Sequence, residues 1–410
     1  MDKRLPLTGI RVLDFAQLAA GPAASKMLAD FGAEVIQIES EAYFAKGGGG
    51  SRNTGPPGAS SRNTGWFHNK FNTNKLSVTV NLSTPKGKDA FFRLARVSDI
   101  FLANRRPQVL QRLGLTYEAM RAVRPDIIYI SMPMMSHEGP RRFYSSPSWG
   151  TQSLAGLNMI SGFADRPPTS PSPYSHPDVS CNPLHGAFVV LAALRYRRRT
   201  GHGQFIELSQ YQSSINWTGP ALLQYTANGT LMERSENRRA GAAPHDVYRC
   251  LGDEAWCAIS VFTDDQWRAL CETIGRSELG TDPSYATVLE RKDRESQLRE
   301  IIETWTTQRT SDEVMETLQA AGVPCAGLNN MEQLLRRDPQ LRARGLWREI
   351  EHPELHKVLF EGWGFGLSKT GSPRVGRAPL MGEHTEYVFH DIVGMSTQEL
   401  EEHLAEGALA

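Results

Sequence analysis

Asp178 is the residue whose surroundings most clearly suggest chemistry. It lies in the stretch Tyr174-Ser-His-Pro-Asp-Val-Ser-Cys-Asn-Pro, directly before an apolar helix expected over residues 183–199. Asn182 is suited to cap this helix, and Pro183 suits its first turn, where a missing N–H costs nothing. The partial positive charge of a helix N-terminus should keep Asp178 ionised. An ionised carboxylate is a weak nucleophile, but it suffices against a thioester, which is an activated acyl donor. The plain alternative is a surface Asp in a proline-rich loop.

The elements around this helix predict an α/β core. The helix ends in the basic turn Arg198-Arg-Thr-Gly-His-Gly-Gln204, which a strand follows. Upstream, apolar runs and alternating patterns predict further strands, and helices lie between them. Strands are expected at residues 10–15, 34–39, 74–82, 100–103, 127–131 and 205–208, and helices at 23–31 and 85–97, the latter capped by Thr84. Alternation of this kind favours a parallel sheet with right-handed crossovers.

The first βαβ unit does not have the pattern of a nicotinamide site. Glu39 ends its second strand, as the acidic residue of a dinucleotide-binding fold does. The turn after the first strand is Ala16-Gln-Leu-Ala-Ala-Gly-Pro22, with one glycine where the fingerprint needs three. We therefore exclude dinucleotide binding.

A basic cluster follows the strand expected at residues 100–103. It comprises Asn104-Arg105-Arg106-Pro107 and, one turn later, Arg112. In α/β proteins the carboxyl edge of the sheet is where ligands bind, and arginine forks suit phosphate oxygens. The alternative is a solvated loop with ordinary surface arginines.

Residues 43–66 are rich in Gly, Ser, Asn and Pro. The pentapeptide Ser-Arg-Asn-Thr-Gly occurs at 51–55 and again at 61–65. A local duplication in a flexible surface loop is one explanation, and a mobile lid over a site is the other. The four glycines at 47–50 precede no helix and are not a phosphate loop.

The pattern changes after Ser214. Two strands, at 247–250 and 256–261, and helices at 264–274, 293–306 and 311–321 predict a second, smaller α+β domain. The tail from Gly382 to His403 is expected to form two helices that pack back on the first domain. The predicted division is therefore a large domain over 1–214, a linker and small domain over 215–330, and a return segment over 331–410.

Composition excludes several classes of partner. The 410 residues include 45 basic and 45 acidic ones, so the formal net charge is zero. This balance argues against nucleic acid or an anionic membrane as the main partner. Five cysteines without CxxC spacing fit a reduced cytosol better than disulfides or zinc, and we expect no metal site. Residues 1–6 lack a signal-peptide core, and the apolar run 187–194 is too short to span a bilayer. We expect a soluble, cytoplasmic protein.

Four separated stretches resemble one known family. They are residues 5–39, 72–114, 197–210 and 382–385, and the segment around Asp178 resembles the same family's signature. The family is the class III CoA-transferases, which includes formyl-CoA transferase and carnitine CoA-transferase. The resemblance implies a Rossmann-like large domain with a parallel sheet, a smaller α+β domain, and linkers that thread two subunits into an interlocked dimer.

The resemblance also implies roles for residues of this chain. Asp178 matches the family's nucleophile, and the turn Gln17-Leu18-Ala19 matches one that helps shape the CoA site. Lys75, Asn104, Arg105, Arg106 and Arg112 fall in stretches that align with contacts to CoA, Arg112 most firmly. Ala240-Gly241-Ala242-Ala243 aligns with a glycine-rich loop over the active site. Here alanines replace most of the glycines, but small residues still allow close approach to a ligand.

Two departures from the family pattern bear on the reaction. Where several members have a Gly-Phe-Gly run, this chain has Met132-Pro-Met-Met-Ser-His-Glu138. Together with residues 237–250, this resembles the benzylsuccinate CoA-transferase subunits, which handle bulky aromatic or dicarboxylic acids. Formyl-CoA transferase carries a carboxylate near its nucleophile where this chain has Trp149, so Asp178 is expected to be oriented differently.

The predicted activity is CoA transfer from an acyl-CoA to a small carboxylic acid, through an aspartyl anhydride and an aspartyl-CoA thioester. CoA is a substrate, and no tightly bound cofactor is expected. An α-methylacyl-CoA racemase is one alternative, but its matching position lies near Pro147 and carries no histidine. His137 and His176 are nearby in sequence, but a histidine in such a place is more often a loop residue than a base. A non-catalytic subunit of a heteromer is the other, because the spacing from Asp178 to Gly186 is one residue longer than in some members. A homodimer is expected, or a heteromer with a paralogous subunit.

Overall fold

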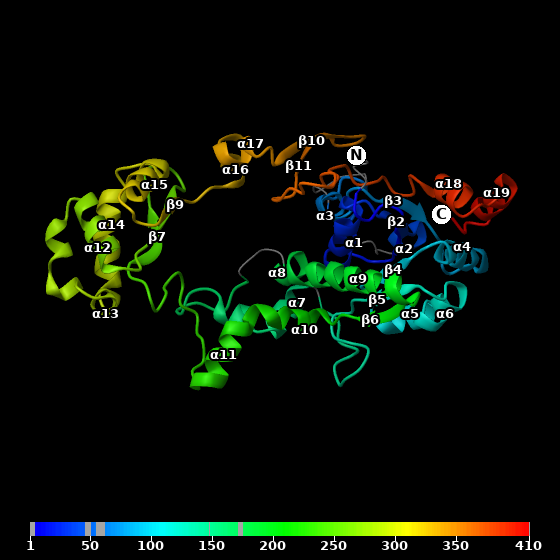
Figure 1. Ribbon diagram of the computed structural model, residues 1–410, viewed down its shortest axis with the longest axis horizontal. Helices are drawn as coiled ribbons and strands as arrows, with labels where there is room; N and C mark the ends of the chain where they lie inside the picture. Colours follow the sequence, from blue (N-terminus) through cyan, green and yellow to red (C-terminus); the bar gives the residue numbers. More distant parts are fainter. Residues whose placement is uncertain (1–4, 46–50, 55–61, 147, 171–174, 410) are drawn as a thin grey trace. The chain divides into compact units, whose positions relative to one another are not determined.

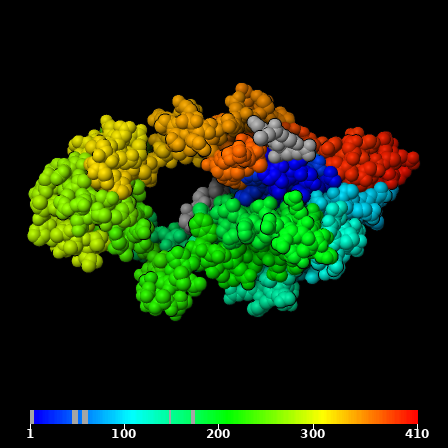
Figure 2. Space-filling view, viewed as in Figure 1, coloured from blue at the N-terminus to red at the C-terminus, as the bar shows by residue number. Residues whose placement is uncertain are grey.

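A computed structural model of the chain describes residues 5–45, 51–54, 62–146, 148–170 and 175–409 (Figure 1). Its contacts divide the chain into two compact units. The first comprises Met1–Met159, Ser170–Met232 and Arg342–Ala410, and the second comprises Ile160–Thr169 and Glu233–Leu341. Figure 2 draws the atoms of the second unit mainly in yellow-green and yellow.

The first unit contains a parallel sheet of six strands in the order β3-β2-β1-β4-β5-β6. Its strands are β1 (Arg11–Asp14), β2 (Glu34–Glu39), β3 (Leu76–Thr79), β4 (Ile100–Ala103), β5 (Ile128–Ser131) and β6 (Gln204–Glu207). This is the strand order of the doubly wound dinucleotide-binding fold, which reverses between β1 and β4. The predicted Rossmann-like α/β architecture is confirmed.

Helices cover both faces of this sheet. On one face, α1 (Ala20–Asp30) and α9 (Cys181–Thr200) pack against Val12, Val35 and Ile130. On the other, α4 (Pro85–Arg96) and α6 (Tyr117–Val123) pack with C-terminal residues against Leu13 and Phe101. Further helices of this unit, N-terminal to its last segment, are α2 (Glu41–Ala45), α3 (Trp66–Phe71), α5 (Pro107–Leu113), α7 (Ser148–Leu154), α10 (Gln210–Ile215) and α11 (Gly219–Asn228).

The C-terminal segment from Arg342 belongs to the first unit. It forms a hairpin of β10 (Trp347–His352) and β11 (His356–Glu361), then α18 (Thr385–Tyr387), the π-helix η5 (Val388–Ile392) and α19 (Thr397–Ala405). The backbone N–H of His384 donates to Ser77 O at 2.9 Å, and Thr79 N donates to Thr385 Oγ1 at 3.2 Å. These bonds cover the open side of β3, so the strand predicted to be half-buried is mostly buried.

The second unit is a smaller α+β body. An antiparallel sheet of three strands, in the order β7-β8-β9, packs against helices around the buried side chains of Trp267, Leu298 and Leu318. Its strands are β7 (His245–Arg249), β8 (Trp256–Ser260) and β9 (Cys325–Gly327). Its helices are α12 (Asp264–Thr273), α13 (Val288–Lys292), α14 (Glu295–Thr306), α15 (Ser311–Ala320), α16 (Met331–Arg336) and, at the boundary with the first unit, α17 (Pro339–Ala343).

The helix next to Asp178 begins earlier than expected. It starts at Cys181, and its N-cap residue is Ser180, which makes no side-chain capping bond. The prediction that Asn182 caps this helix is wrong, because Asn182 lies inside the first turn and its side chain bonds elsewhere. Gly201 ends the helix with a φ of 76°, in the left-handed region that glycine favours.

No helix of the described ranges is long and apolar enough to cross a bilayer.

Candidate active site

Asp178 lies in the one-turn helix α8 (His176–Val179), directly before the N-terminus of α9. Its side chain is buried, and Asn182 Nδ2 donates to Asp178 Oδ1 at 3.1 Å. The backbone N–H of Asp178 donates to Ser175 O at 3.1 Å. The carboxylate thus lies at the N-terminal end of a twenty-residue helix, whose backbone dipoles are favourable to negative charge.

Close packing of α9 on α1 places this carboxylate beside the α1 N-terminus. A Cβ on Gly186 would lie 3.0 Å from Met132 Cε and 3.2 Å from Ala24 Cβ, so the two helices approach closely because this position has no side chain. Helix α8 in turn contacts α1. The turn that leads into α1, residues 17–19, therefore lies near the candidate nucleophile.

Gln152 positions α8, a role that no local sequence pattern indicated. Its Oε1 accepts a hydrogen bond from His176 N at 2.8 Å, and its Nε2 donates to Asn158 Oδ1 at 2.6 Å. The side chain is fully buried in α7. Trp149, in the same helix, is 62% exposed, whereas the buried Asn182 amide donates to Asp178 Oδ1.

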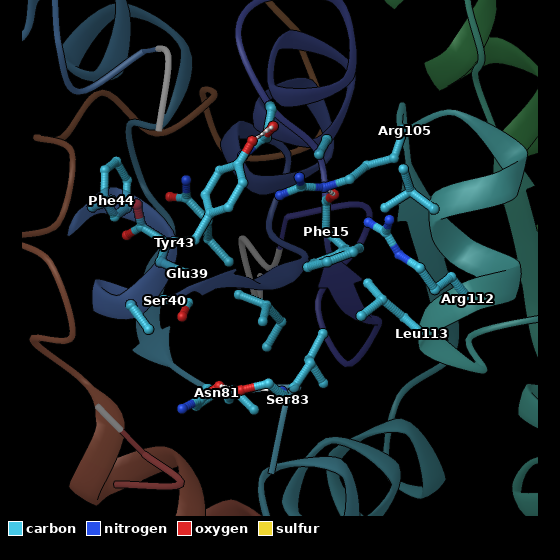
Figure 3. Close-up of a pocket in the computed structure, with 18 of the residues that line it drawn as sticks. Phe15, Glu39, Ser40, Tyr43, Phe44, Asn81, Ser83, Arg105, Arg112 and Leu113 are labelled. Atoms are coloured by element: carbon cyan, nitrogen blue, oxygen red, sulfur yellow. Dashed lines mark hydrogen bonds between the residues drawn. The ribbon is translucent and has the colours of Figure 1, made fainter. Parts of the chain in front are cut away.

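A cavity of about 330 Å³ opens at the carboxyl ends of β1 to β4 (Figure 3). Arg105 and Arg112 reach it from one side, and Tyr43 and Phe44 stand on the other. Its lining residues come from several strand ends and from α5: Phe15, Ala16, Gln17, Gln37, Ile38, Glu39, Ser40, Ala42, Tyr43, Phe44, Ser51, Val80, Asn81, Leu82, Ser83, Arg105, Val109, Arg112 and Leu113. The cavity lies where open α/β sheets bind their ligands, beside the point at which the strand order reverses.

Two of the predicted arginines enter this cavity. The Arg105 guanidinium lies 4.4 Å from the ring centre of Phe15 and 5.3 Å from that of Tyr43, and burial lowers the pKa of Arg105. Neither Arg105 nor Arg112 forms an ion pair with a carboxylate in the part of the chain that the structure describes. Arg106 is exposed at the N-cap of α5 and does not line the cavity.

Gln17 and Asn104 join the two turns at the edge of the cavity. Gln17 N donates to Asn104 Oδ1 at 2.7 Å, and Asn104 Nδ2 donates to Gln17 O at 2.7 Å. Leu18 is 46% exposed and has a φ of 63°, an uncommon conformation for a branched side chain. Ala19 is buried at the N-cap of α1. The structure thus brings Gln17, Asn104, Arg105 and Arg112 together.

Lys75 lies inside the fold. Its Nζ donates to Asp14 Oδ2 at 2.9 Å, to Pro22 O at 3.0 Å and to Asn72 Oδ1 at 2.8 Å. All three ammonium donors therefore have partners within the protein, and Lys75 holds the start of α1 against β1. It does not line the cavity that contains Arg105.

The predicted lid residues lie in the second unit. Ala240 and Gly241 are exposed, whereas Ala242 and Ala243 are buried. Ala243 N donates to Val261 O at 3.1 Å, and Arg291 Nε donates to Ala243 O at 2.9 Å. Half of the segment is thereby fixed to the core of its own unit.

The histidines weighed for a racemase have other partners. His137 Nε2 lies 2.8 Å from Ser131 Oγ, and its ring packs edge-on against Phe205. The His176 ring packs edge-on against Trp217 at 4.5 Å. Pro147, Tyr174 and the glycines at 47–50 lie outside the described residues. Within the described ranges, no group of three His, Cys, Asp or Glu side chains could hold a metal ion.

Comparison with known families identifies the family of the chain. The model of CoA-transferase family III matches residues 7–385. The chain belongs to this family. The predicted family assignment and the prediction that the chain is a class III CoA-transferase enzyme are confirmed.

Three relatives of this family III enzyme are similar to it over nearly their full length. It is 29% identical to a succinyl-CoA–D-citramalate CoA-transferase of Chloroflexus aurantiacus, over 96% of each chain. It is 30% identical to a formyl-CoA:oxalate CoA-transferase of Rhodopseudomonas palustris, over 98% of this chain and 97% of the relative. It is also 30% identical to the beta subunit of a succinyl-CoA–L-malate CoA-transferase of C. aurantiacus, over 97% and 96%.

A solved structure of a CAIB/BAIF family protein from Brucella suis has the same fold. It superimposes with a TM-score of 0.86 at 26% identity, over 95% of this enzyme and all of that chain.

Proposed function

We propose that this family III enzyme transfers CoA from an acyl-CoA thioester to a carboxylic acid, with Asp178 as the covalent nucleophile. The observation that carries the proposal is the buried Asp178 carboxylate, bonded by Asn182 at the N-terminus of α9. A carboxylate in this setting stays ionised and has a fixed direction of attack. A surface Asp in a flexible loop would have neither property.

The proposed reaction exchanges one thioester for another. Asp178 attacks the donor thioester carbonyl, and the CoA thiolate leaves, so an aspartyl anhydride forms. The thiolate then attacks the aspartyl carbonyl, which releases the donor acid and leaves an aspartyl-CoA thioester. An acceptor carboxylate repeats these steps in reverse. Binding energy from the CoA nucleotide holds the thiolate near Asp178 between steps.

The cavity beside β1 and β4 is the proposed site of that nucleotide. Arg105 and Arg112 present cationic groups without carboxylate partners among the described residues, and phosphates supply the matching charge. Asn81 and Ser83, on the far side of the cavity, offer hydrogen-bonding groups for the nucleoside. These two residues follow β3, which ends at Thr79. Because the strand was expected to extend to residue 82, only Ser83 stood at its predicted carboxyl end, and Asn81 was missed.

A substrate panel tests the proposal. The relatives' names pair CoA with citramalate, malate and oxalate, so small dicarboxylic acids are the first acceptors to assay. Aromatic dicarboxylic acids such as benzylsuccinate are tested next, because residues 132–138 and 237–250 resemble the benzylsuccinate CoA-transferase subunits. Purified protein is incubated with succinyl-CoA or formyl-CoA and each acid, and the new acyl-CoA is measured by mass spectrometry. No transfer with any pair, alone or with a paralogous subunit, would reject the proposal.

Two alternatives are separated in the same experiment. A racemase would exchange the α-proton of a 2-methylacyl-CoA with deuterated water without any acceptor acid. A non-catalytic subunit would bind CoA but turn over only after a paralogous subunit is added. The similarity to a beta subunit makes that control necessary.

The proposed assembly is a dimer, and two helices of the first unit support it. Leu184, Phe188 and Leu191 form an apolar stripe on α9, and Phe188 is 70% exposed. Helix α11 buries none of its residues in its own chain, although Leu223 and Tyr225 are large and apolar. Apolar surface of this extent indicates a protein interface, and a second copy is the proposed occupant. The interlocked topology and the cytoplasmic location stay predictions.

A further inference from the structure

The side chain of Asn182 has an unusual position for a residue at a helix N-terminus. It is fully buried in the first turn of α9, and it caps no backbone N–H. Its Nδ2 donates to Asp178 Oδ1 at 3.1 Å across the kink between α8 and α9. A buried amide of this kind is costly unless its bonds are made, so its direction toward Asp178 needs a reason.

Cys181 fixes the orientation of that amide. The Cys181 thiol lies 3.8 Å from Asn182 Oδ1 and 3.7 Å from Pro177 O. The thiol has one proton and two acceptors within reach, Pro177 O and Asn182 Oδ1. When it donates to Asn182 Oδ1, it holds the oxygen of the amide away from Asp178 and the nitrogen toward it. Burial raises the pKa of the Cys181 thiol, which therefore stays protonated and able to donate.

We propose that Asn182 is a catalytic residue that binds the oxyanion formed on Asp178 itself, and that Cys181 is the positioning residue that orients it. The inference rests on the proposed function, in which the aspartyl carbonyl is attacked by the CoA thiolate. It assigns to this chain a donor for that step, 3.1 Å from the atom on which the charge develops.

The step proceeds as follows. A sulfur electron pair of the thiolate forms a bond to Cγ of the acylated Asp178, and the carbonyl π pair moves onto Oδ1. The N–H of Asn182, already directed at Oδ1, stabilises this negative charge. When the carbonyl re-forms, the bond from Cγ to the bridging oxygen breaks, and the donor acid leaves as its carboxylate. No proton is transferred in this step, which agrees with an amide as the donor.

The same hydrogen bond acts on the free enzyme. A donor that bonds the ionised carboxylate lowers the pKa of that carboxyl group, so removal of the donor raises it. Loss of Asn182 should therefore move the acid limb of the kcat/KM profile to higher pH, by about one unit for a bond to a charged group. A purely structural defect would lower activity without moving this limb.

The test is Asn182→Ala in the intact protein, with Asn216→Asp as the matched control. Asn216 is an exposed amide at the C-cap of α10 whose Nδ2 bonds the main chain at Ser213 O, and no role is proposed for it above. Asn182→Ala should lower kcat by about 100-fold or more, as loss of an oxyanion donor does. It should also shift the acid limb upward and leave the Kd for CoA within about two-fold, whereas Asn216→Asp should change none of these.

Cys181 provides a milder measurement if Asn182→Ala does not fold. Cys181→Ala should lower kcat by a smaller factor and shift the acid limb in the same direction, and Cys181→Ser, which keeps a donor, should restore both. A wild-type kcat and a wild-type acid limb in Asn182→Ala or in Cys181→Ala would overturn the inference. The variant Asp178→Ala distinguishes failure of this inference from failure of the proposed function. If the wild-type enzyme is active and Asp178→Ala is inactive, the proposed function holds whatever the result for Asn182. If Asp178→Ala is fully active, the proposed function itself is wrong.

Discussion

Glu39 and Arg52 form a bidentate ion pair that is almost completely buried. Arg52 Nε lies 2.6 Å from Glu39 Oε1, and Arg52 Nη2 lies 2.6 Å from Glu39 Oε2, which also accepts from Ser77 Oγ. Burial alone would raise the pKa of Glu39, but the charge and hydrogen bonds of Arg52 hold it below its ordinary value. The negative charge of Glu39, at the end of β2, is therefore balanced by Arg52, and the carboxylate is not available to bind a ribose hydroxyl.

The same arginine also joins the two copies of the repeated pentapeptide. Arg52 belongs to the first copy and Asn63 to the second, and Arg52 Nη1 donates to Asn63 Oδ1 at 2.8 Å. Asn63 Oδ1 in turn accepts from Met381 N at 3.0 Å. The two copies are thus bonded to each other and to the C-terminal segment at these residues, which argues against a freely moving lid there.

Replacement of Arg52 tests this arrangement. Arg52→Ala leaves a buried carboxylate without its partner, so it should lower the free energy of unfolding by roughly 3–5 kcal/mol. Arg62 is the equivalent arginine of the second copy and is exposed, so Arg62→Ala should cost less than about 1 kcal/mol. Denaturant unfolding of both variants measures the difference; equal, small losses would mean that the pair does not hold the fold.

His68 should make the protein less stable in acid. Burial, followed by the charge of Arg52, lowers the pKa of His68 to about 3. The unfolded chain then binds a proton near pH 6.5 that the folded protein does not, so stability falls as the pH falls below 6.5. Between pH 7 and pH 5 this one group should account for about 2 kcal/mol of the loss.

The variant His68→Gln isolates that contribution. It keeps a donor for Pro379 O, which the ring nitrogen Nε2 approaches to 3.0 Å, but it cannot titrate. The dependence of the unfolding free energy on pH between 7 and 5 should become shallower than in the wild type. An unchanged slope would show that His68 is protonated in the folded state or is not buried.

Two arginines near the proposed CoA cavity should differ in their effect on CoA affinity. Arg112 lines it and Arg106 does not. A charge-assisted contact contributes about 1.5–3 kcal/mol, so Arg112→Ala should weaken CoA binding about ten-fold or more. Arg106→Ala should change the Kd by less than about two-fold. Calorimetric titration with CoA measures both values of Kd. An equal effect of both variants would mean that the nucleotide does not bind in this cavity.

The apolar stripe of α9 predicts the effect of a charge at the proposed interface. Phe188→Glu should separate or unfold the dimer, because the new carboxylate would be buried between subunits. Leu289→Glu is the matched control, since Leu289 is 71% exposed in the second unit and outside the stripe. Light scattering should give about twice 45.6 kDa for the wild type and the control. A folded, active Phe188→Glu dimer would contradict the assignment of this surface.

The core strands and helices could be predicted from local sequence patterns, whereas the geometry of the site depends on contacts between residues far apart in the sequence. Continuous apolar runs such as Ile100–Ala103 are buried on both faces of a parallel sheet, so such strands can be recognised from the sequence alone. The β10–β11 hairpin was missed because its strands are largely exposed and carry many charges. Its residues show no apolar face that would mark a strand.

Single polar residues near the nucleophile illustrate the same limit. Asn182 before Pro183 matches a helix cap, yet the helix begins at Cys181, two residues earlier than expected, and the Asn182 amide bonds Asp178 instead. Gln152 lies in another helix, and no local spacing relates it to His176. Lys75 matched a family contact in sequence, but the structure surrounds its ammonium group with Asp14, Pro22 and Asn72.

The most direct test of the central claim is to trap the covalent intermediate on Asp178. Wild-type enzyme incubated with an acyl-CoA and hydroxylamine should acquire a hydroxamate at Asp178, located by peptide mass spectrometry, because a thioester or anhydride of this carboxylate reacts with the amine. Asp178→Asn should bind CoA normally, show no labelling and lose at least about a thousand-fold in transfer rate. Label on a different residue, or full transfer activity in Asp178→Asn, would contradict the account.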